Sequence, residues 1–288
     1  MNKYQKNGAS YYDYVSNYDY DSYLEIPNGT NSLQNAWLTI VINYEIKFAD
    51  SKNPIPGLIF TRPDGVFAKD SDGAFFPIDD WDGKSRVKFE EKFKRGGCFW
   101  NRNFLLVTPN GFSRFDYESL QGAGSSSGWI CRPNILCMFA LNDGRNPNYF
   151  KTPVHLTIRA VRAKTVDQFR SNGLTYDDND VDNSVVWHEL GHALGQKHIK
   201  ALFGDKSCMI DINQDVCYDN PFDESKMKAN IMGRGTGLHI VNAAPWWERI
   251  AEHTDTSKFQ WCVTQMTDLP PRRMPLGLKD GLMPNVAW

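Results

Sequence analysis

One segment constrains the fold of this chain more than any other: residues 188–198, with the sequence HELGHALGQKH. On a helix of 3.6 residues per turn, His188 and His192 project from one face, so both imidazoles can bind the same ion. Gly195 has the backbone freedom to end such a helix and reverse the chain, which would return His198 toward the other two rings. The spacing therefore predicts a helix, a sharp turn and a metal site made of three histidines.

The ligand set and the acidic residue inside it predict a catalytic zinc site. Three imidazole ligands leave the fourth coordination position open for water and substrate, whereas structural zinc sites are closed. Glu189 lies beside His188 on the same helix, and we expect it to act as general base and general acid rather than as a ligand. Asp182, Asn183 and Ser184 are all suitable N-cap residues, so the helix is expected to begin there.

This pattern resembles the metzincin clan of zinc peptidases. The resemblance implies a tight turn with a methionine below the metal, and residues 230–235, which contain Met232, fit that role. It also implies an α+β fold: a mixed twisted sheet with the active-site helix, a smaller C-terminal subdomain after Gly195, and a cleft between them. Ile199 and Arg234 occupy two positions that distinguish families of the clan, and neither matches a named family. The family within the clan is therefore not assigned.

The composition divides the chain into three parts. Residues 1–33 combine many tyrosines with Asp, Asn and Ser but contain no Trp or Phe. We expect an N-terminal arm there, either a flexible extension or a pro-segment that docks on a partner. The metallopeptidase domain is expected at 34–268, with an upper subdomain at 34–195 and a lower one at 196–268. The Pro-rich tail at 269–288 is expected to lie along the surface.

Hydrophobic periodicity predicts strands and a helix before the histidine motif. In Trp37–Phe48, one side of the predicted strand carries Leu38, Ile40, Ile42, Tyr44, Ile46 and Phe48, and the other carries Thr39, Asn43, Glu45 and Lys47, which is typical of a half-buried strand. Ser85–Arg95 predicts a short charged helix that Gly96 and Gly97 would end. Further strands are expected at 98–108, 129–141 and 154–163, and the Gly/Ser tract at 122–128 is expected to be a flexible surface loop.

The sequence also offers candidate oxyanion helpers and candidate calcium ligands, and each has a simpler alternative. Arg234 and His239 are candidate helpers for a developing oxyanion, and a surface role is the alternative. Two acidic clusters carry oxygen ligands at alternate positions, as calcium-binding loops do, and an ordinary solvated loop is the alternative. Their residues are Asp178, Asp180, Asp182, Asp211, Asn213 and Asp215. Structural calcium, which metzincins commonly bind, is therefore a second metal to test.

The six cysteines form an even set, which permits three disulfides in an oxidising compartment or reduced thiols inside the cell. Cys208 and Cys217 are the pair we expect to be linked, because they enclose a polar segment with little core of its own. Cys98 is expected to be a buried strand cysteine. A disulfide favours a secreted or otherwise exported protein. No apolar secretory segment follows the N-terminal lysines, so the route of export stays open.

Charge and hydropathy exclude some partners. The net charge of −2 gives no basic excess for nucleic acid. The longest apolar run, Ile135–Leu141, is far shorter than the ~20 residues that span a bilayer.

From the histidine motif and the resemblance to metzincins, we expect a zinc endopeptidase that acts on a protein or peptide substrate. Two alternatives remain: a delivered effector or binding protein whose zinc site is only a scaffold, and a zinc hydrolase that cuts a non-peptide amide. The oligomeric state is left open.

Overall fold

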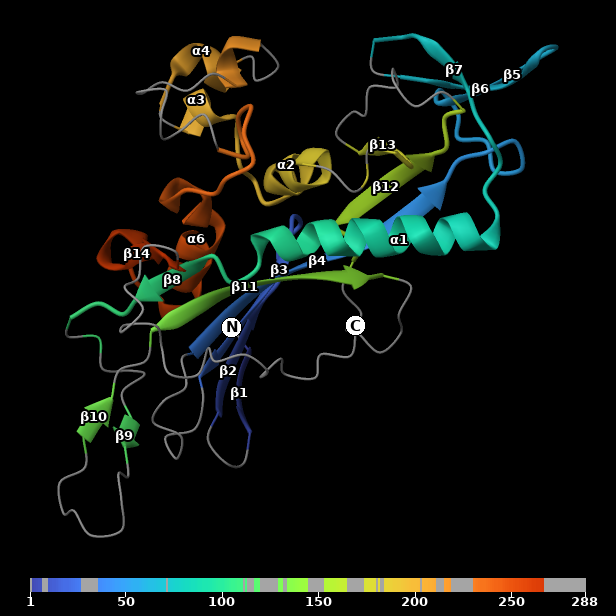
Figure 1. Cartoon of the computed structure of the whole chain (residues 1–288). Helices are drawn as coiled ribbons and strands as arrows, with labels where there is room; N and C mark the ends of the chain where they lie inside the picture. Colours follow the sequence, from blue (N-terminus) through green and yellow to red (C-terminus); the bar gives the residue numbers. More distant parts are fainter. Residues whose placement is uncertain are drawn as a thin grey trace.

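The computed structural model describes most of the chain between residues 2 and 266 (Figure 1). The described residues are 2–6, 10–26, 36–70, 72–110, 112, 117–119, 129–131, 134–144, 153–164, 174–179, 181, 184–202, 204–210, 215–218 and 230–266. The predicted loop at 122–128 and the predicted tail at 269–288 lie outside them. None of the helices in the described ranges is long and apolar enough to cross a membrane.

A mixed, twisted sheet forms the centre of the molecule. Its main path runs β1 (Asn2–Lys6), β2 (Ser10–Val15), β3 (Asp21–Ile26), β4 (Ala36–Phe48), β11 (Ile135–Asp143), β8 (Phe104–Val107) and β14 (Cys262–Gln265), and β12 (Leu156–Val161) joins β4 and carries β13 (Thr175–Asp177). Two small antiparallel sheets contain β5 (Ile59–Arg62), β6 (Gly65–Lys69) and β7 (Phe75–Pro77), and β9 (Tyr117–Ser119) and β10 (Trp129–Cys131). The described fold is thus mixed α/β, with the predicted mixed sheet at its centre.

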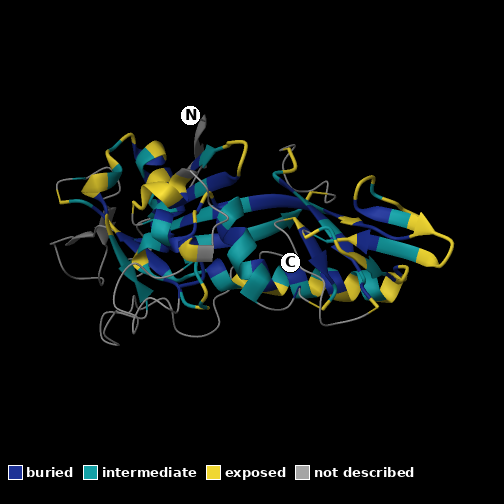
Figure 2. Cartoon of the chain, turned by 90° about the horizontal axis from the view of Figure 1, so that it is seen from above, coloured by how far each residue is buried: buried dark blue, intermediate teal, exposed yellow. Residues whose placement is uncertain are grey.

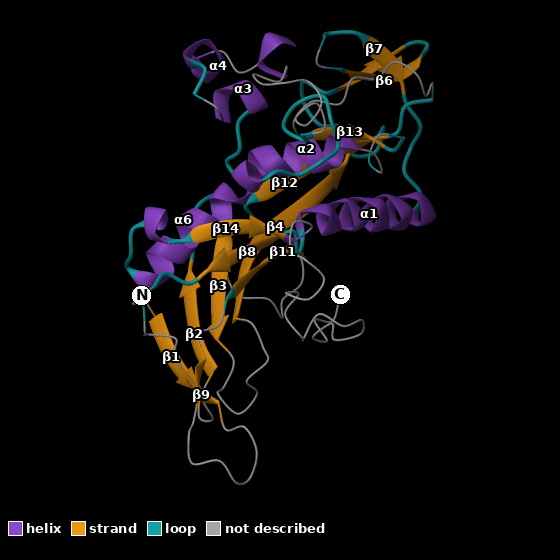
Figure 3. Ribbon diagram, turned by 60° about the vertical axis from the view of Figure 1, so that its left-hand side comes forward, coloured by secondary structure: helices purple, strands orange, loops and turns teal. Residues whose placement is uncertain are grey.

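Some helices pack against this sheet, and others lie beyond it (Figure 3). They are α1 (Gly83–Gly97), α2 (Ser184–Ala193), α3 (Ile199–Leu202), α4 (Lys206–Ile210) and α6 (Ala244–Thr254), with short 3-10 turns η1 (Cys98–Trp100), η2 (Asp215–Tyr218), η3 (Ile240–Ala243) and η4 (Lys258–Gln260). Helices α1 and α2 lie side by side, and α6 packs on β2, β3 and β4. Helix α6 therefore packs directly on the sheet, and α2 packs on α1.

Strand β4 is the centre of the core, and its predicted alternation is confirmed. Leu38, Ile40 and Ile42 are fully buried, whereas Thr39 and Val41 between them are partly exposed. Asn43, expected on the polar side of the strand, is buried as well. The strand is long enough to pair in parallel with both β11 and β12, and β3 joins it in antiparallel orientation. Figure 2 shows the resulting band of buried residues along the central strands. The predicted strand at 154–163 is likewise confirmed as β12.

Helix α1 is longer than predicted, because its two glycines do not end it. Asp82 caps the helix by accepting from the Ser85 amide, and the helix continues through both glycines. A Cβ on Gly96 would lie 2.8 Å from the side chain of Val186 in α2, and a Cβ on Gly97 would overlap Leu141 of β11. The glycines therefore allow α1 to approach α2 and the sheet closely.

Two strand predictions were wrong in extent. Within 98–108, only Phe104–Val107 forms a strand, because α1 continues directly into η1. Cys98 is consequently exposed on η1 and not buried in a strand. The predicted strand at 129–141 divides into β10 and β11, which belong to different sheets. The apolar character of this segment did not reveal that the chain leaves one sheet after Cys131 and enters another at Ile135.

The N-terminal segment was expected to be an arm outside the core, but part of it belongs to the main sheet. Strand β3 pairs with β4, β2 pairs with β3, and Tyr20, Leu24 and Ile26 are buried in the main core. Phe and Trp are absent from this segment, but its alternating Leu, Ile and Tyr residues are sufficient to cover one edge of β4. Residues 10–26 are therefore an integral part of the sheet.

A buried polar network fixes these N-terminal strands to α6. His253 donates from Nδ1 to the Asp13 carboxylate at 2.9 Å, and its Nε2 lies 2.9 Å from the Ser22 hydroxyl. All three side chains are fully buried. Arg249, one turn earlier on α6, donates to the carbonyl of Tyr20. Buried polar groups need such partners, so this network fixes the position of α6 on β2 and β3.

Candidate metal centre

The histidine motif adopts the predicted helix and turn. Helix α2 begins at Ser184, and its buried face, with Val186 and Leu190, packs into the main core. The chain leaves the helix through Gly195, whose φ of +79° lies in the left-handed region that favours glycine. This turn directs the following residues back toward the helix, and His198 is buried there.

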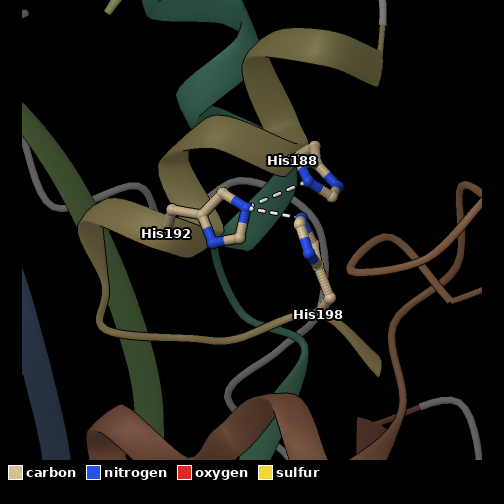
Figure 4. A group of neighbouring side chains, drawn as sticks. All are labelled: His188, His192 and His198. Carbon is tan, nitrogen blue, oxygen red and sulfur yellow. Dashed lines mark hydrogen bonds between the residues drawn. The ribbon is translucent and has the colours of Figure 1, made fainter. Parts of the chain in front are cut away.

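The three predicted ligands converge, as Figure 4 shows. Nε2 of His192 lies 3.1 Å from Nε2 of His188 and 3.1 Å from Nε2 of His198. The candidate ligand atoms of all three residues lie within 4.8 Å of one another. Residues from a helix and from the segment after its turn thus form one potential metal-binding group.

Backbone carbonyls orient two of these rings. Nδ1 of His188 donates to the carbonyl of Ile231 at 2.6 Å, and Nδ1 of His192 donates to the carbonyl of Gln196 at 2.7 Å. A ring that carries its proton on Nδ1 has a lone pair on Nε2, so two nitrogen lone pairs face each other at 3.1 Å. A cation satisfies this arrangement: tetrahedral zinc with Zn–N bonds of ~2.0–2.1 Å separates its ligand nitrogens by about 3.3 Å. The donor set therefore fits a divalent transition metal such as zinc.

Burial keeps these rings in the form that binds metals. Desolvation lowers the pKa of His188 to about 4, with smaller contributions from the neighbouring His192 and His198. Desolvation also lowers the pKa of His192. Neutral imidazole is the ligand form, so both rings can bind a metal at neutral pH without first losing a proton.

Glu189 directly follows the first ligand on α2, and its side chain is partly buried. Burial raises the pKa of Glu189 to about 7. Tyr176, buried on β13, has a raised pKa, mainly because of its own burial and secondly because of the negative charge of Glu189. A carboxyl group with a pKa near neutrality can both accept and release a proton under physiological conditions.

The predicted methionine turn lies directly beneath the helix. Met232 is fully buried, and its thioether occupies the place that a Cβ on Gly191 would need. The carbonyl of Met232 accepts from the amide of Ile199, which immediately follows the third histidine. The turn thus contacts both the helix and the segment that carries His198.

A network of buried amides, which the sequence analysis missed, holds the turn in place. Asn230 accepts from the Met232 amide and donates to Asn242, and Asn242 donates to the side-chain oxygen of Gln196. Gln196 donates back to the carbonyl of Asn242. Gln196 directly follows Gly195, so the network joins the end of the helix to η3 and to the methionine turn. Isolated Asn and Gln residues carry no periodic signal that predicts such a network.

Tyr218 is an aromatic neighbour of the ligands that the sequence analysis also missed. Its ring centroid lies 3.8 Å from that of His198 and 5.7 Å from that of His188. It ends η2 and directly follows Cys217, which forms the predicted disulfide with Cys208. The disulfide prediction is thus confirmed, and among the described cysteines Cys98, Cys137 and Cys262 are free.

The remaining predicted site residues are not part of this group. Arg234 is exposed in the turn, and His239 precedes η3, where its amide donates to Asn242. Asp178 lies 3.7 Å from the amine of Lys92 on α1, so its carboxylate faces a cation of the protein. Of the other predicted calcium ligands, Asp180, Asp182, Asp211 and Asn213 and the side chain of Asp215 lie outside the described residues.

In comparisons with known proteins, no family model, no curated protein and no solved structure matches this chain. The functional assignment therefore rests on the residues and geometry of the site itself.

Proposed function

We propose that the chain is a zinc-dependent endopeptidase. The observation that carries the proposal is the convergence of the Nε2 atoms of His188, His192 and His198, with the partly buried Glu189 directly following His188 on α2. A site that served only as a scaffold would need the three ligands but no group able to accept a proton next to them. The presence of Glu189 therefore favours catalysis over the scaffold alternative.

Each residue has a distinct part in the proposed reaction. His188, His192 and His198 would hold the metal, and the carbonyls of Ile231 and Gln196 keep two of the rings correctly oriented. Zinc bound by three histidines supplies Lewis acidity that polarises a carbonyl group and activates water near neutral pH.

Glu189 would then move the protons. Its carboxylate would accept a proton from the attacking water and would return that proton to the nitrogen of the leaving amine. A pKa of about 7 suits both steps, because neither protonation state is strongly favoured at neutral pH. Atoms balance in this scheme: one peptide bond and one water molecule give one carboxylic acid and one amine.

The methionine turn and the helix motif together support a peptide substrate. Both features resemble metzincins, whose substrates are proteins and peptides, and Met232 packs against Gly191 of the helix that carries two of the candidate ligands. We propose that the substrate binds beside α2, between the part of the chain before Gly195 and the part after it.

A peptide library derived from a proteome, incubated with the zinc-loaded full chain, tests this proposal. Mass spectrometry should find new peptide termini with a reproducible residue preference around the cleavage site. Glu189→Ala should abolish these products and leave zinc bound, because the carboxylate transfers protons and is not a ligand. Zinc binding without cleavage of any peptide would favour the scaffold or the non-peptide amide alternative. Loss of zinc from the variant would show that Glu189 is a ligand.

A further inference from the structure

The ring of Tyr218 packs against the ring of the third ligand, His198, in a tilted arrangement. The tyrosine ring is inclined by 38° to the ring of His198 and by 20° to the ring of His188. The rings of His188 and His198 are themselves inclined by only 29°. His192, in contrast, meets both histidine rings nearly edge-on. Tyr218 therefore extends the group formed by the two roughly parallel rings and covers His198.

The backbone around Tyr218 is fixed from two directions. A Cβ on Gly233 would lie 2.8 Å from the carbonyl oxygen of Tyr218, so the methionine turn touches the tyrosine backbone. Cys217, the preceding residue, is joined to Cys208 of α4. Both cysteines are fully buried and pack with Ala201 of α3, which follows His198 closely in sequence. The disulfide thus ties the segment of Tyr218 to the segment of the third ligand.

This contact has a specific consequence for metal binding. A ring packed at 3.8 Å restricts the rotamers of His198, so less side-chain entropy is lost when the imidazole binds an ion. An imidazole that binds a divalent cation also acquires partial positive charge, which the face of an aromatic ring attracts. Both effects depend on the aromatic ring of Tyr218 and do not require its hydroxyl group.

From this geometry we infer that Tyr218 is a positioning residue of the metal site. Its ring holds His198 in the orientation that binds the metal, and the Cys208–Cys217 disulfide holds Tyr218 against His198. The inference rests on the proposed function, since it concerns the same site. It gives a role to a disulfide that lies, in sequence, between the third ligand and the methionine turn.

Zinc affinity of the full chain, measured with Zn²⁺ against a chromophoric chelator, tests the inference. Residues that orient a ligand commonly change metal affinity by 10–100-fold, and we expect Tyr218→Leu to weaken zinc binding by at least ~10-fold. Tyr218→Phe keeps the ring and should bind zinc within ~3-fold of the parent. Phe99→Leu is the matched control, because Phe99 stacks on Trp187 and not on a ligand, and this variant should retain parental affinity.

Two further measurements separate positioning from general stability. The absorption spectrum of bound Co²⁺ should change in Tyr218→Leu and not in Phe99→Leu, because only the first variant alters a ligand ring. A variant with both Cys208→Ala and Cys217→Ala keeps the tyrosine but releases its segment, and it should also bind zinc more weakly. The melting temperature of the metal-free variants verifies that each of them is folded.

The possible results distinguish this inference from the proposed function. Parental zinc affinity in Tyr218→Leu would overturn the inference alone, and so would an equal loss in Tyr218→Phe, since the hydroxyl would then be the determinant. If Tyr218→Leu does not fold, parental affinity in the double cysteine variant overturns it. Failure of the parent chain to bind zinc would overturn the proposed function, and the inference with it.

Discussion

The main-chain carbonyl of Ile231 accepts a hydrogen bond from Nδ1 of His188 at 2.6 Å, across 43 residues of sequence. This bond fixes the tautomer of a ligand on α2 from the turn that contains Met232. The helix and the turn are therefore parts of one site: the turn determines which nitrogen of His188 faces the other two rings.

Metal removal should lower the stability of the protein. We expect one zinc ion per chain, because the three ligands converge on a single position. A ligand that binds only the folded state stabilises it by about 2.7 kcal/mol when its concentration is 100 times the dissociation constant. Chelation should therefore lower the melting temperature, and readdition of zinc should restore it. His198→Ala should remove this response to zinc, and an unchanged response would contradict the assignment of the third ligand.

Substitutions of Met232 should show whether its side chain stabilises the protein by filling space under the helix. Met232→Leu conserves apolar volume, so it should cost less than ~1.5 kcal/mol of unfolding free energy and retain most zinc affinity. Met232→Ala should leave a cavity under Gly191 and cost ~2–5 kcal/mol. Urea denaturation of the metal-free proteins measures both values. Equal stabilities of Met232→Ala and the parent would show that the turn does not support the helix in this way.

Stability should decline in mild acid because of His253. Desolvation lowers the pKa of His253 below its ordinary value of 6.5, although the Asp13 carboxylate opposes this shift. Arg249 lowers this pKa further, and Glu252 raises it. The folded state thus favours the neutral ring, so this contribution to stability is complete above pH ~6.5 and is lost as the pH falls below that value.

Free energies of unfolding at pH 7.5 and pH 5.5 measure this effect. His253→Gln can still donate to Asp13 and accept from Ser22 but does not titrate, so it should lose less stability in acid than the parent. His239→Gln is the control outside this network and should follow the parent. The other buried histidines are present in all three proteins, so the comparison isolates His253. Equal acid losses in His253→Gln and the parent would exclude this role.

Because α1 approaches the sheet closely, replacing two glycines of this helix by alanine should change the stability of the protein by different amounts. Gly97→Ala would place its Cβ on Leu141, and overpacking of this kind typically costs ~1–3 kcal/mol. Gly83→Ala has open space around its Cβ and should be neutral or slightly stabilising, because alanine is the better helix former. Thermal unfolding of the two variants provides the test. Similar melting temperatures would show that the Gly97 contact relaxes at little cost.

The parts of the candidate site that depend on residues close together in sequence could be predicted from the sequence. The spacing of His188 and His192 on one helix and the positive φ of Gly195 follow from 3.6 residues per turn and from glycine's freedom. The contact of Tyr218 with His198 depends on a fold around a disulfide, and the links among Gln196, Asn230 and Asn242 depend on tertiary packing. No periodic pattern records either of them.

The same distinction explains the fold predictions. The alternation in β4 reflects one buried face and was visible in the sequence. The glycines of α1 resemble a helix end when they are considered alone, and only the positions of Val186 and Leu141 reveal them as packing contacts. The N-terminal strands were missed because Asp13 packs against His253 of α6, 240 residues away in sequence, and no local pattern records that contact.

The bond between Asp13 and His253 joins positions 240 residues apart. Closing a long segment of chain costs conformational entropy, and structures dominated by distant contacts fold slowly. During synthesis, β2 therefore has no α6 to pack against until nearly all of the domain has left the ribosome. We expect the metal site, whose residues all lie after position 187, to assemble only in the last stage of folding. Early domain fragments should accordingly be unable to bind zinc.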